Sequence, residues 1–244
     1  MDRILPLRAD DALTCQAAKE LAEVGFVSIP GPFSAHRFCA VAEAYDHAMA
    51  TASGPDFNIG STTTRMSALL GADASFEDVL IHEPLLQICG QFLGEDFKLS
   101  SFLGRTLRPG TSAQALHADL PRDSKDAPLL GFILMIDPFK EDNGATRFVP
   151  KSHTWRGAPG DVMPDTRAQH PGESLGCGEA GTMLLFNAAI WHGHTANVTS
   201  CERRSIQGYF VRRSGMQGFD FNSHLPKQVK ARMPSLARYL LALQ

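Results

Sequence analysis

The chain has 244 residues, 43% of them hydrophobic, which is enough for one domain with a sizeable core. Its net charge of -3 is nearly balanced and no stretch could span a bilayer, so neither nucleic acid nor a membrane is expected as a partner. Met1 to Pro6 lacks the apolar core of a signal peptide, and five scattered cysteines without a CxxC pair indicate reduced thiols in a cytoplasmic protein.

The first part of the chain, residues 1–95, is expected to be mainly helical. Phe26 to Ile29 predicts one short strand, which a Pro-Gly-Pro turn ends. Thr51 to Arg65 is polar and is interpreted as loop. Helical spacing of apolar residues predicts helices over 13–24, 38–49 and 76–92.

From Phe97 the pattern changes to strands. The loops between them are polar, as at 123–126 and 153–171. Strands are predicted at 97–107, near 115, and at 129–136, 146–149, 183–186, 190–194 and 205–211.

This order of elements predicts an α+β fold in a single domain over residues 1–244. Short strands joined by turns fit a jelly roll, expected at 96–213. A polar tail and a final helix from about Pro234 are expected within 214–244. The substrate pocket is expected between the loops at 61–70, 153–171 and 215–224.

The stretch from Gln114 to Asp119 carries a His-x-Asp pair, His117 and Asp119. In a strand, residues two apart point to the same face, so these side chains can bind one metal ion. On a helix they would diverge, because helical neighbours are three or four residues apart. The flanking leucines form no helical face, and the stretch is therefore interpreted as extended.

A third metal ligand is expected from the distant strand that ends in Trp191-His192-Gly193-His194. His192 and His194 would face the same side of this strand, so the spacing leaves both open. Two imidazoles and one carboxylate on one face of an octahedral ion form the facial triad of non-haem Fe(II) oxygenases. Arg203 and Arg204 follow, face opposite ways, and offer an anchor for an organic acid.

Three runs of the sequence share a pattern with a known family. They are Gln-x-Leu-His-x-Asp at 114–119, Asn-Gly-Ala-Thr-Arg-Phe-Val-Pro-Lys-Ser-His at 143–153, and Trp-His-Gly through Arg at 191–203. With these runs the chain resembles the phytanoyl-CoA dioxygenase family of Fe(II)/2-oxoglutarate oxygenases. The family often has Gly where this chain has Lys151. The resemblance covers most of the chain and implies a double-stranded β-helix core with the metal at its open end.

The resemblance also implies the metal ligands. His117, Asp119 and His192 would bind Fe(II). His192 is favoured over His194 because the family has an aromatic-His-Gly pattern there. A small residue usually occupies the position of His194, so this second imidazole departs from the family pattern.

The same resemblance implies how the cosubstrate binds. Arg203 would pair with the far carboxylate of 2-oxoglutarate, and the family spacing favours it over Arg204. An arginine suits this role because its planar fork binds a carboxylate through two hydrogen bonds. Gln114 and Thr146 match positions that often contact the cosubstrate. The implied cofactors are Fe(II), 2-oxoglutarate and O2.

The implied reaction converts 2-oxoglutarate to succinate and CO2 and oxidises a small organic molecule. Related halogenases lack the ligand carboxylate, so Asp119 favours hydroxylation, with desaturation, epoxidation or ring chemistry left open. The first two runs are most similar to members that tailor secondary metabolites, and an acyl-CoA thioester is an alternative substrate. Two other functions stay open: a cupin-type metal dioxygenase that does not use 2-oxoglutarate, and a catalytically silent binding protein on the same barrel.

Overall fold

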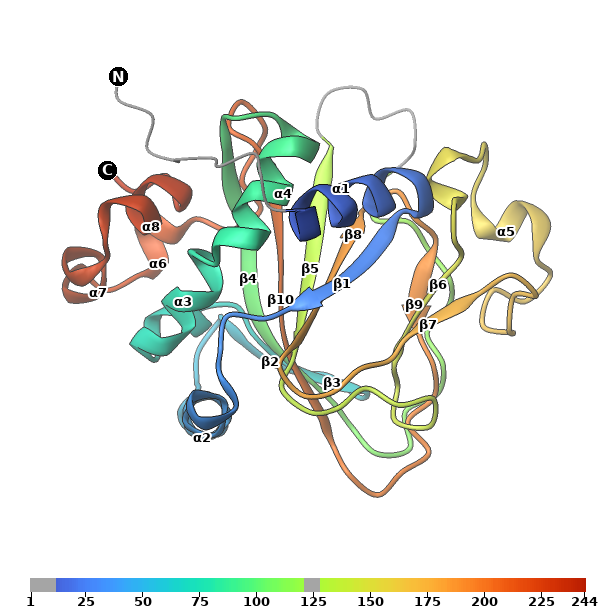
Figure 1. Cartoon of the computed structure of the whole chain (residues 1–244). Coiled ribbons are helices and arrows are strands. Elements are labelled where there is room, and N and C mark those ends of the chain that lie inside the picture. Colours follow the sequence, from blue (N-terminus) through green and yellow to red (C-terminus); the bar gives the residue numbers. More distant parts are fainter. Residues whose placement is uncertain (1–11, 121–127) are drawn as a thin grey trace.

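The computed structural model describes residues 12–120 and 128–244 (Figure 1). The N-terminal stretch from Met1 to Pro6 and the loop predicted at 123–126 lie outside these residues. Two antiparallel sheets form the centre of the molecule. The larger sheet has the order β1-β8-β5-β10-β4-β3-β2, and the smaller has the order β7-β6-β9.

The strands differ greatly in length, and the longest lie in the middle of the larger sheet. This sheet consists of β1 (Phe26–Pro30), β2 (Phe57–Ile59), β3 (Thr63–Met66), β4 (Phe97–Leu107), β5 (Leu129–Met135), β8 (Thr182–Asn187) and β10 (Arg203–Arg212). The smaller sheet consists of β6 (Thr146–Phe148), β7 (Ser174–Gly176) and β9 (His192–His194).

Helices cover one side of the larger sheet, and the C-terminal helices lie at the opposite end of the molecule from α5 (Figure 1). The α-helices are α1 (Ala12–Val24), α2 (Ala35–Thr51), α3 (Glu77–Leu80), α4 (Glu83–Leu93), α5 (Pro159–Val162), α6 (Phe221–His224), α7 (Lys227–Arg232) and α8 (Ser235–Leu240). Short 3-10 turns are η1 (Leu69–Gly71), η2 (Ala74–Phe76) and η3 (Ser152–Thr154). None of the helices in the described residues is long and apolar enough to cross a membrane.

The larger sheet has two different faces because neighbouring side chains on a strand point in opposite directions. Phe132 of β5 and Phe210 of β10 belong to the main core, which the helices cover. Ile133, next to Phe132, belongs instead to a second core between the two sheets. Full burial of such a side chain stabilises the fold by about 1.5–3 kcal/mol. This second face, on the inner side of the two sheets, is where the site lies.

The predicted α+β class and jelly-roll core are confirmed by these two facing antiparallel sheets. The division of the chain at residues 95 and 213 stays a prediction. Strands from the N-terminal part do join the larger sheet: β1 pairs with β8, and β3 pairs with β4.

Several local predictions were wrong, each for a local reason. Residues 57–59 form β2 and 63–66 form β3, where a loop was predicted, because strands of three and four residues are too short to show a clear alternating pattern. The helix predicted at 76–92 is interrupted at His82, and α4 begins at Glu83 with Pro84 in its first turn. Residues near Ala115 form no strand, only an isolated bridge between His117 and His192. The predicted loop at 153–171 contains α5, and the tail contains α6 and α7.

Candidate metal centre

The structure brings His117, Asp119 and His192 together. One ligand atom from each lies within 4.8 Å of the other two. Nε2 of His117 is 3.6 Å from Oδ1 of Asp119, and Nε2 of His192 is 3.4 Å from Oδ2. Among the described residues, no other cluster of His, Cys, Asp or Glu side chains has this geometry.

Backbone hydrogen bonds set the register between the two chain segments that carry the cluster. The amide of His117 donates to the carbonyl of His192 at 3.0 Å, and the amide of His192 donates back at 2.8 Å. Two residues further on, the amide of Asp119 donates to the carbonyl of Ala188 at 2.9 Å. The segment is therefore held extended beside β9, and the His-x-Asp spacing works as it would in a strand.

Each imidazole is oriented by its other nitrogen. Nδ1 of His117 lies 3.0 Å from the carbonyl of Ala115, and Nδ1 of His192 lies 2.9 Å from that of Ile190. A carbonyl only accepts, so both Nδ1 atoms donate, and both Nε2 atoms keep a lone pair for a metal. Burial lowers the pKa of His192, and this favours the neutral form that a metal needs.

Tyr209 on β10 adds a contact that the sequence did not reveal. Its hydroxyl donates to Oδ2 of Asp119 at 2.5 Å. Its ring packs edge-on against Phe186 with ring centres 5.8 Å apart, and Phe186 in turn packs against His192 at 4.9 Å. Tyr209 thus supports Asp119, and Phe186 supports His192.

The cluster opens into a cavity of about 260 Å³, called the metal cavity below. Asp119 is the only carboxylate among its lining residues. Its walls are formed by Arg65, Leu103, Arg105, Gln114, His117, Asp119, Ile133, Thr146, Phe186, His192, Gly193, His194, Arg203, Gln207 and Tyr209.

Arg203 is a buried cation that forms no ion pair with any residue the structure describes. Its side chain is almost fully buried, and its guanidinium lies 4.0 Å from the centre of the Phe139 ring. Its Nε and one terminal nitrogen are buried and have no hydrogen-bond partner among the described residues. Burial, followed by repulsion from Arg105, lowers the pKa of Arg203 to about 9. A charge held in this way is costly unless an anion joins it, so the residue fits the carboxylate of an organic acid.

The neighbouring Arg204 has a different environment. It forms ion pairs with Asp137 and Asp46, each at 2.6 Å, and it does not line the metal cavity. The two arginines face opposite ways, as alternation on a strand requires. The structure therefore places Arg203, and not Arg204, beside the cluster.

Gln114, Thr146 and His194 also line the metal cavity. Thr146 on β6 lies directly across from His194 on β9. Nδ1 of His194 donates to the carbonyl of Thr195 at 2.8 Å, and burial lowers its pKa to about 4. His194 is outside the metal-type cluster, although it shares the cavity with His192.

Sequence reasoning missed Tyr209 and Arg105 as parts of this cavity, whereas Arg65 lies in the segment 61–70 that was expected to line the substrate pocket. Tyr209 lies six residues after Arg203 on the same strand, so alternation places both on one face. Arg105 has the same relation to Leu103 on β4. No motif marks these residues, and parity along correctly assigned strands is the only signal that could have found them.

Buried Arg147 connects two chain segments next to the site. Its guanidinium forms an ion pair with Glu173 at 3.2 Å and donates to the carbonyls of Gln114 and Thr166, each at 2.8 Å. These bonds tie the segment after α5 to the segment that carries the His-x-Asp pair. Arg147 lies within the run at 143–153, and no motif in the sequence predicts its structural role.

The family model of phytanoyl-CoA dioxygenase (PhyH) matches residues 21–205. The chain belongs to the phytanoyl-CoA dioxygenase family. The match includes the cluster and Arg203, and it confirms the resemblance that the three sequence runs predicted. His194, the histidine that departs from the family pattern, lines the metal cavity with His117 and His192.

Fungal dioxygenases are among the proteins to which this chain is similar. Dioxygenase aneA of Aspergillus aculeatus is 29% identical over 75% of this chain and 64% of its own length. The Fe(II)/2-oxoglutarate-dependent dioxygenase nvfF of Aspergillus novofumigatus is 27% identical over 72% of this chain and 60% of its own length. The chain therefore spans less than two thirds of the length of these relatives.

Solved structures share the fold. The epimerase SnoN, in complex with Fe3+, alpha ketoglutarate and nogalamycin RO, has a TM-score of 0.67 and 17% identity over 83% of this chain and 85% of its own. HygX from Streptomyces hygroscopicus, with nickel, 2-oxoglutarate and hygromycin B bound, has a TM-score of 0.66 and 16% identity over 83% of this chain and 88% of its own. At this identity the likeness shows a common fold.

Proposed function

We propose that the protein is an Fe(II)/2-oxoglutarate-dependent dioxygenase that oxidises a small organic molecule. The observation that carries the proposal is the pairing, in one cavity, of the His117, Asp119 and His192 cluster with the unpaired cation of Arg203. The cluster suits Fe(II), because two imidazoles and one carboxylate leave metal positions open on one side. Arg203 suits the far carboxylate of 2-oxoglutarate.

When bound, Fe(II) and 2-oxoglutarate supply the oxidising chemistry, in which O2 is consumed and succinate and CO2 are formed. The protein's own residues hold the metal, orient the substrate and exclude water. Gln114 and Thr146 offer polar groups to the cosubstrate from the walls of the metal cavity. Leu103 and Ile133 give the cavity an apolar side. Asp119 fills the carboxylate position of the triad, which favours hydroxylation.

The substrate is proposed to be a small molecule from secondary metabolism. The solved structure of SnoN, an epimerase from nogalamycin biosynthesis, supports this class. A cytoplasmic location is also part of the proposal. Cys39, Cys89, Cys177 and Cys201 are free thiols, in keeping with a reducing compartment.

Anaerobic spectroscopy tests the proposal. Fe(II) and then 2-oxoglutarate are added without oxygen, and the visible charge-transfer band of the chelate is recorded. We expect the band in the wild type, a much weaker band in Arg203→Ala at the same 2-oxoglutarate concentration, and an unchanged band in Arg204→Ala. Arg204→Ala is the matched control because it removes the same charge from the adjacent position.

The contrary result is equally clear. If iron is shown to be bound and the wild type gives no band, the 2-oxoglutarate proposal fails. Oxygen consumption with iron but without 2-oxoglutarate would then favour a cupin-type dioxygenase that binds its substrate directly.

A further inference from the structure

A second cavity of about 550 Å³ adjoins the metal cavity. It is called the basic cavity here, because three arginines and no carboxylate are among its lining residues. Those residues are Thr62, Arg65, Arg105, Thr111, Ser112, Ala113, Gln114, Ala115, Arg167 and His194. Its volume falls in the range of small-molecule sites, about 300–1,000 Å³.

The two cavities have a common wall. Arg65, Arg105, Gln114 and His194 line both of them. Arg65 on β3 lies directly across from Arg105 on β4, so two cations occupy neighbouring positions on one sheet. A molecule that fills the basic cavity therefore borders the space next to the metal cluster.

Arg105 is the central cation of this wall. Its Nε is buried and has no hydrogen-bond partner among the described residues. Burial, followed by repulsion from Arg65, lowers the pKa of Arg105 to about 10. Two like charges on facing strand positions destabilise each other. This arrangement is stabilised when an anion lies between them.

The residues of the proposed cosubstrate site do not supply that anion. With Fe(II), the Asp119 carboxylate, the 2-oxoglutarate dianion and the Arg203 cation together, positive and negative charges cancel. The charges of Arg65, Arg105 and Arg167 are left over. Asp165 lies near Arg167 in sequence, but its carboxylate accepts a hydrogen bond from the backbone amide of Arg167. A cleft lined by one sign of charge attracts ligands of the opposite sign.

We propose that the basic cavity binds an anionic group of the substrate, so that the substrate is an organic acid: a carboxylate, or a sulfate or phosphate ester. This inference rests on the proposed function, which it extends from the cosubstrate to the substrate class. Arg65, Arg105 and Arg167 hold the anionic group, and the carbon to be oxidised lies toward the metal cavity. The exposed Arg167 comes from the segment that Arg147 ties down, so it is carried on an anchored part of the chain.

The same chemistry could come from a different source, namely the second carboxylate of 2-oxoglutarate. Arg105 lines the metal cavity as well, and it would then serve the cosubstrate. An experiment must therefore follow the two anions separately. Sulfate is a suitable probe for the basic cavity, and the charge-transfer band reports 2-oxoglutarate.

The test measures sulfate binding by calorimetry to the anaerobic complex with Fe(II) and saturating 2-oxoglutarate. Sodium chloride at matched ionic strength corrects for screening. The wild type is compared with Arg105→Gln and Arg167→Gln. Arg37→Gln is the control, since it removes the same charge from α2, away from both cavities.

We expect sulfate to bind the wild-type complex while the band persists, and each of the two variants to weaken sulfate binding about tenfold or more. The 2-oxoglutarate affinity should change far less than the sulfate affinity. Arg37→Gln should match the wild type. Because Arg167 is exposed, its variant gives an answer even if Arg105→Gln folds poorly.

Three results would overturn the inference: no sulfate binding to the wild-type complex, loss of the band as sulfate binds, or an equal loss of 2-oxoglutarate and sulfate affinity in Arg105→Gln. Failure of the proposed function looks different. In that case the wild type shows no band at all, and sulfate binding to the iron-free protein still reports on the basic cavity.

Discussion

The hydroxyl of Tyr209 donates to Oδ2 of Asp119 at 2.5 Å, from a strand on the larger sheet to the segment that faces it. The bond fixes the direction of the one carboxylate in the cluster. Burial, followed by the charge of Asp119, raises the pKa of Tyr209 well above its usual value, so the phenol keeps its proton and remains a donor. Outer partners of this kind hold metal ligands in place before the metal arrives.

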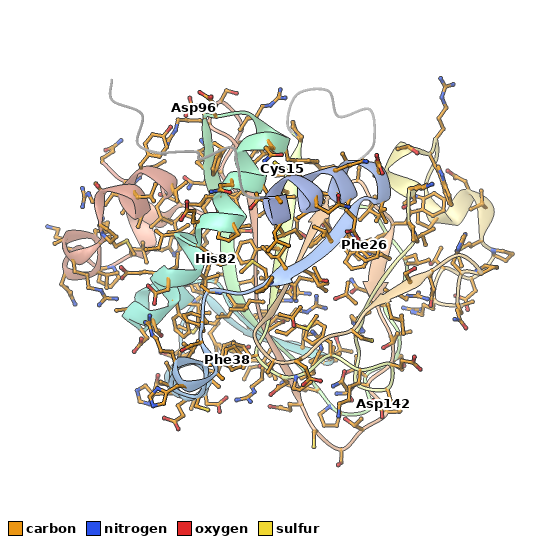
Figure 2. All side chains as sticks on the ribbon, in the orientation of Figure 1. Cys15, Phe26, Phe38, His82, Asp96 and Asp142 are labelled. Carbon is orange, nitrogen blue, oxygen red and sulfur yellow. The ribbon has the colours of Figure 1, made fainter. Side chains whose placement is uncertain are left out.

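Tyr209→Phe should therefore weaken Fe(II) binding by about tenfold or more, the effect typical of losing an outer partner of a ligand. Anaerobic Fe(II) titration measures it. Tyr239→Phe is the matched control, because Tyr239 makes the same 2.5 Å bond to Asp96. Figure 2 shows Asp96 at the upper end of the molecule, near the C-terminal helices. Equal Fe(II) affinity in wild type and Tyr209→Phe would contradict the prediction.

The two histidines of β9 give a second prediction. His192→Ala should lower Fe(II) affinity by more than about 100-fold, beyond the range for outer partners. His194→Ala should leave it close to the wild-type value, because His194 is not in the cluster. The same titration measures both variants. A reversed order of effects would make His194 the ligand.

The buried pair of Arg147 and Glu173 leads to a prediction on stability. Removing one partner of a buried ion pair leaves an uncompensated charge, so Arg147→Met should lower the free energy of unfolding by about 3–5 kcal/mol. Urea denaturation measures this. The double variant with Glu173→Met should lose less than the sum of the two single variants. Additive losses would show that the pair is not coupled.

His82 should make stability depend on pH. Its Nε2 lies 3.0 Å from the carbonyl of Pro30, and Figure 2 shows it below α4 beside β1. Burial lowers the pKa of His82. As pH falls below about 6.5, the unfolded chain therefore takes up this proton before the folded chain does, and stability is lost.

The measurement is the free energy of unfolding in urea on both sides of that pH. It should fall more steeply toward acid in the wild type than in His82→Gln. Identical pH profiles for the two proteins would show that His82 contributes nothing to this dependence.

Part of this fold is visible in local sequence patterns. The apolar run of β5 and the periodic α1 are predicted correctly because burial dictates their residue types. The short strands β2 and β3 are not, because backbone pairing holds them and strands of three and four residues carry too short a pattern. The break before α4 depends on Pro84, whose effect the apolar spacing hides.

The candidate site was also only partly predictable from the sequence. His117 and Asp119 are close in sequence, so spacing alone relates them. Their relation to His192 and Arg203 came from the family resemblance. Tyr209 and Arg105 act through contacts between strands far apart in the chain, and only side-chain alternation along correctly assigned strands could have pointed to them.

The three residues of β9 also limit how this protein can change over evolution. β6 occupies one side of the strand, and His117 bridges to it on the other. A single inserted residue would shift the pairing and turn His192 away from Asp119. Loops elsewhere can lengthen, whereas this strand cannot change its length without losing the register that places His192 beside Asp119.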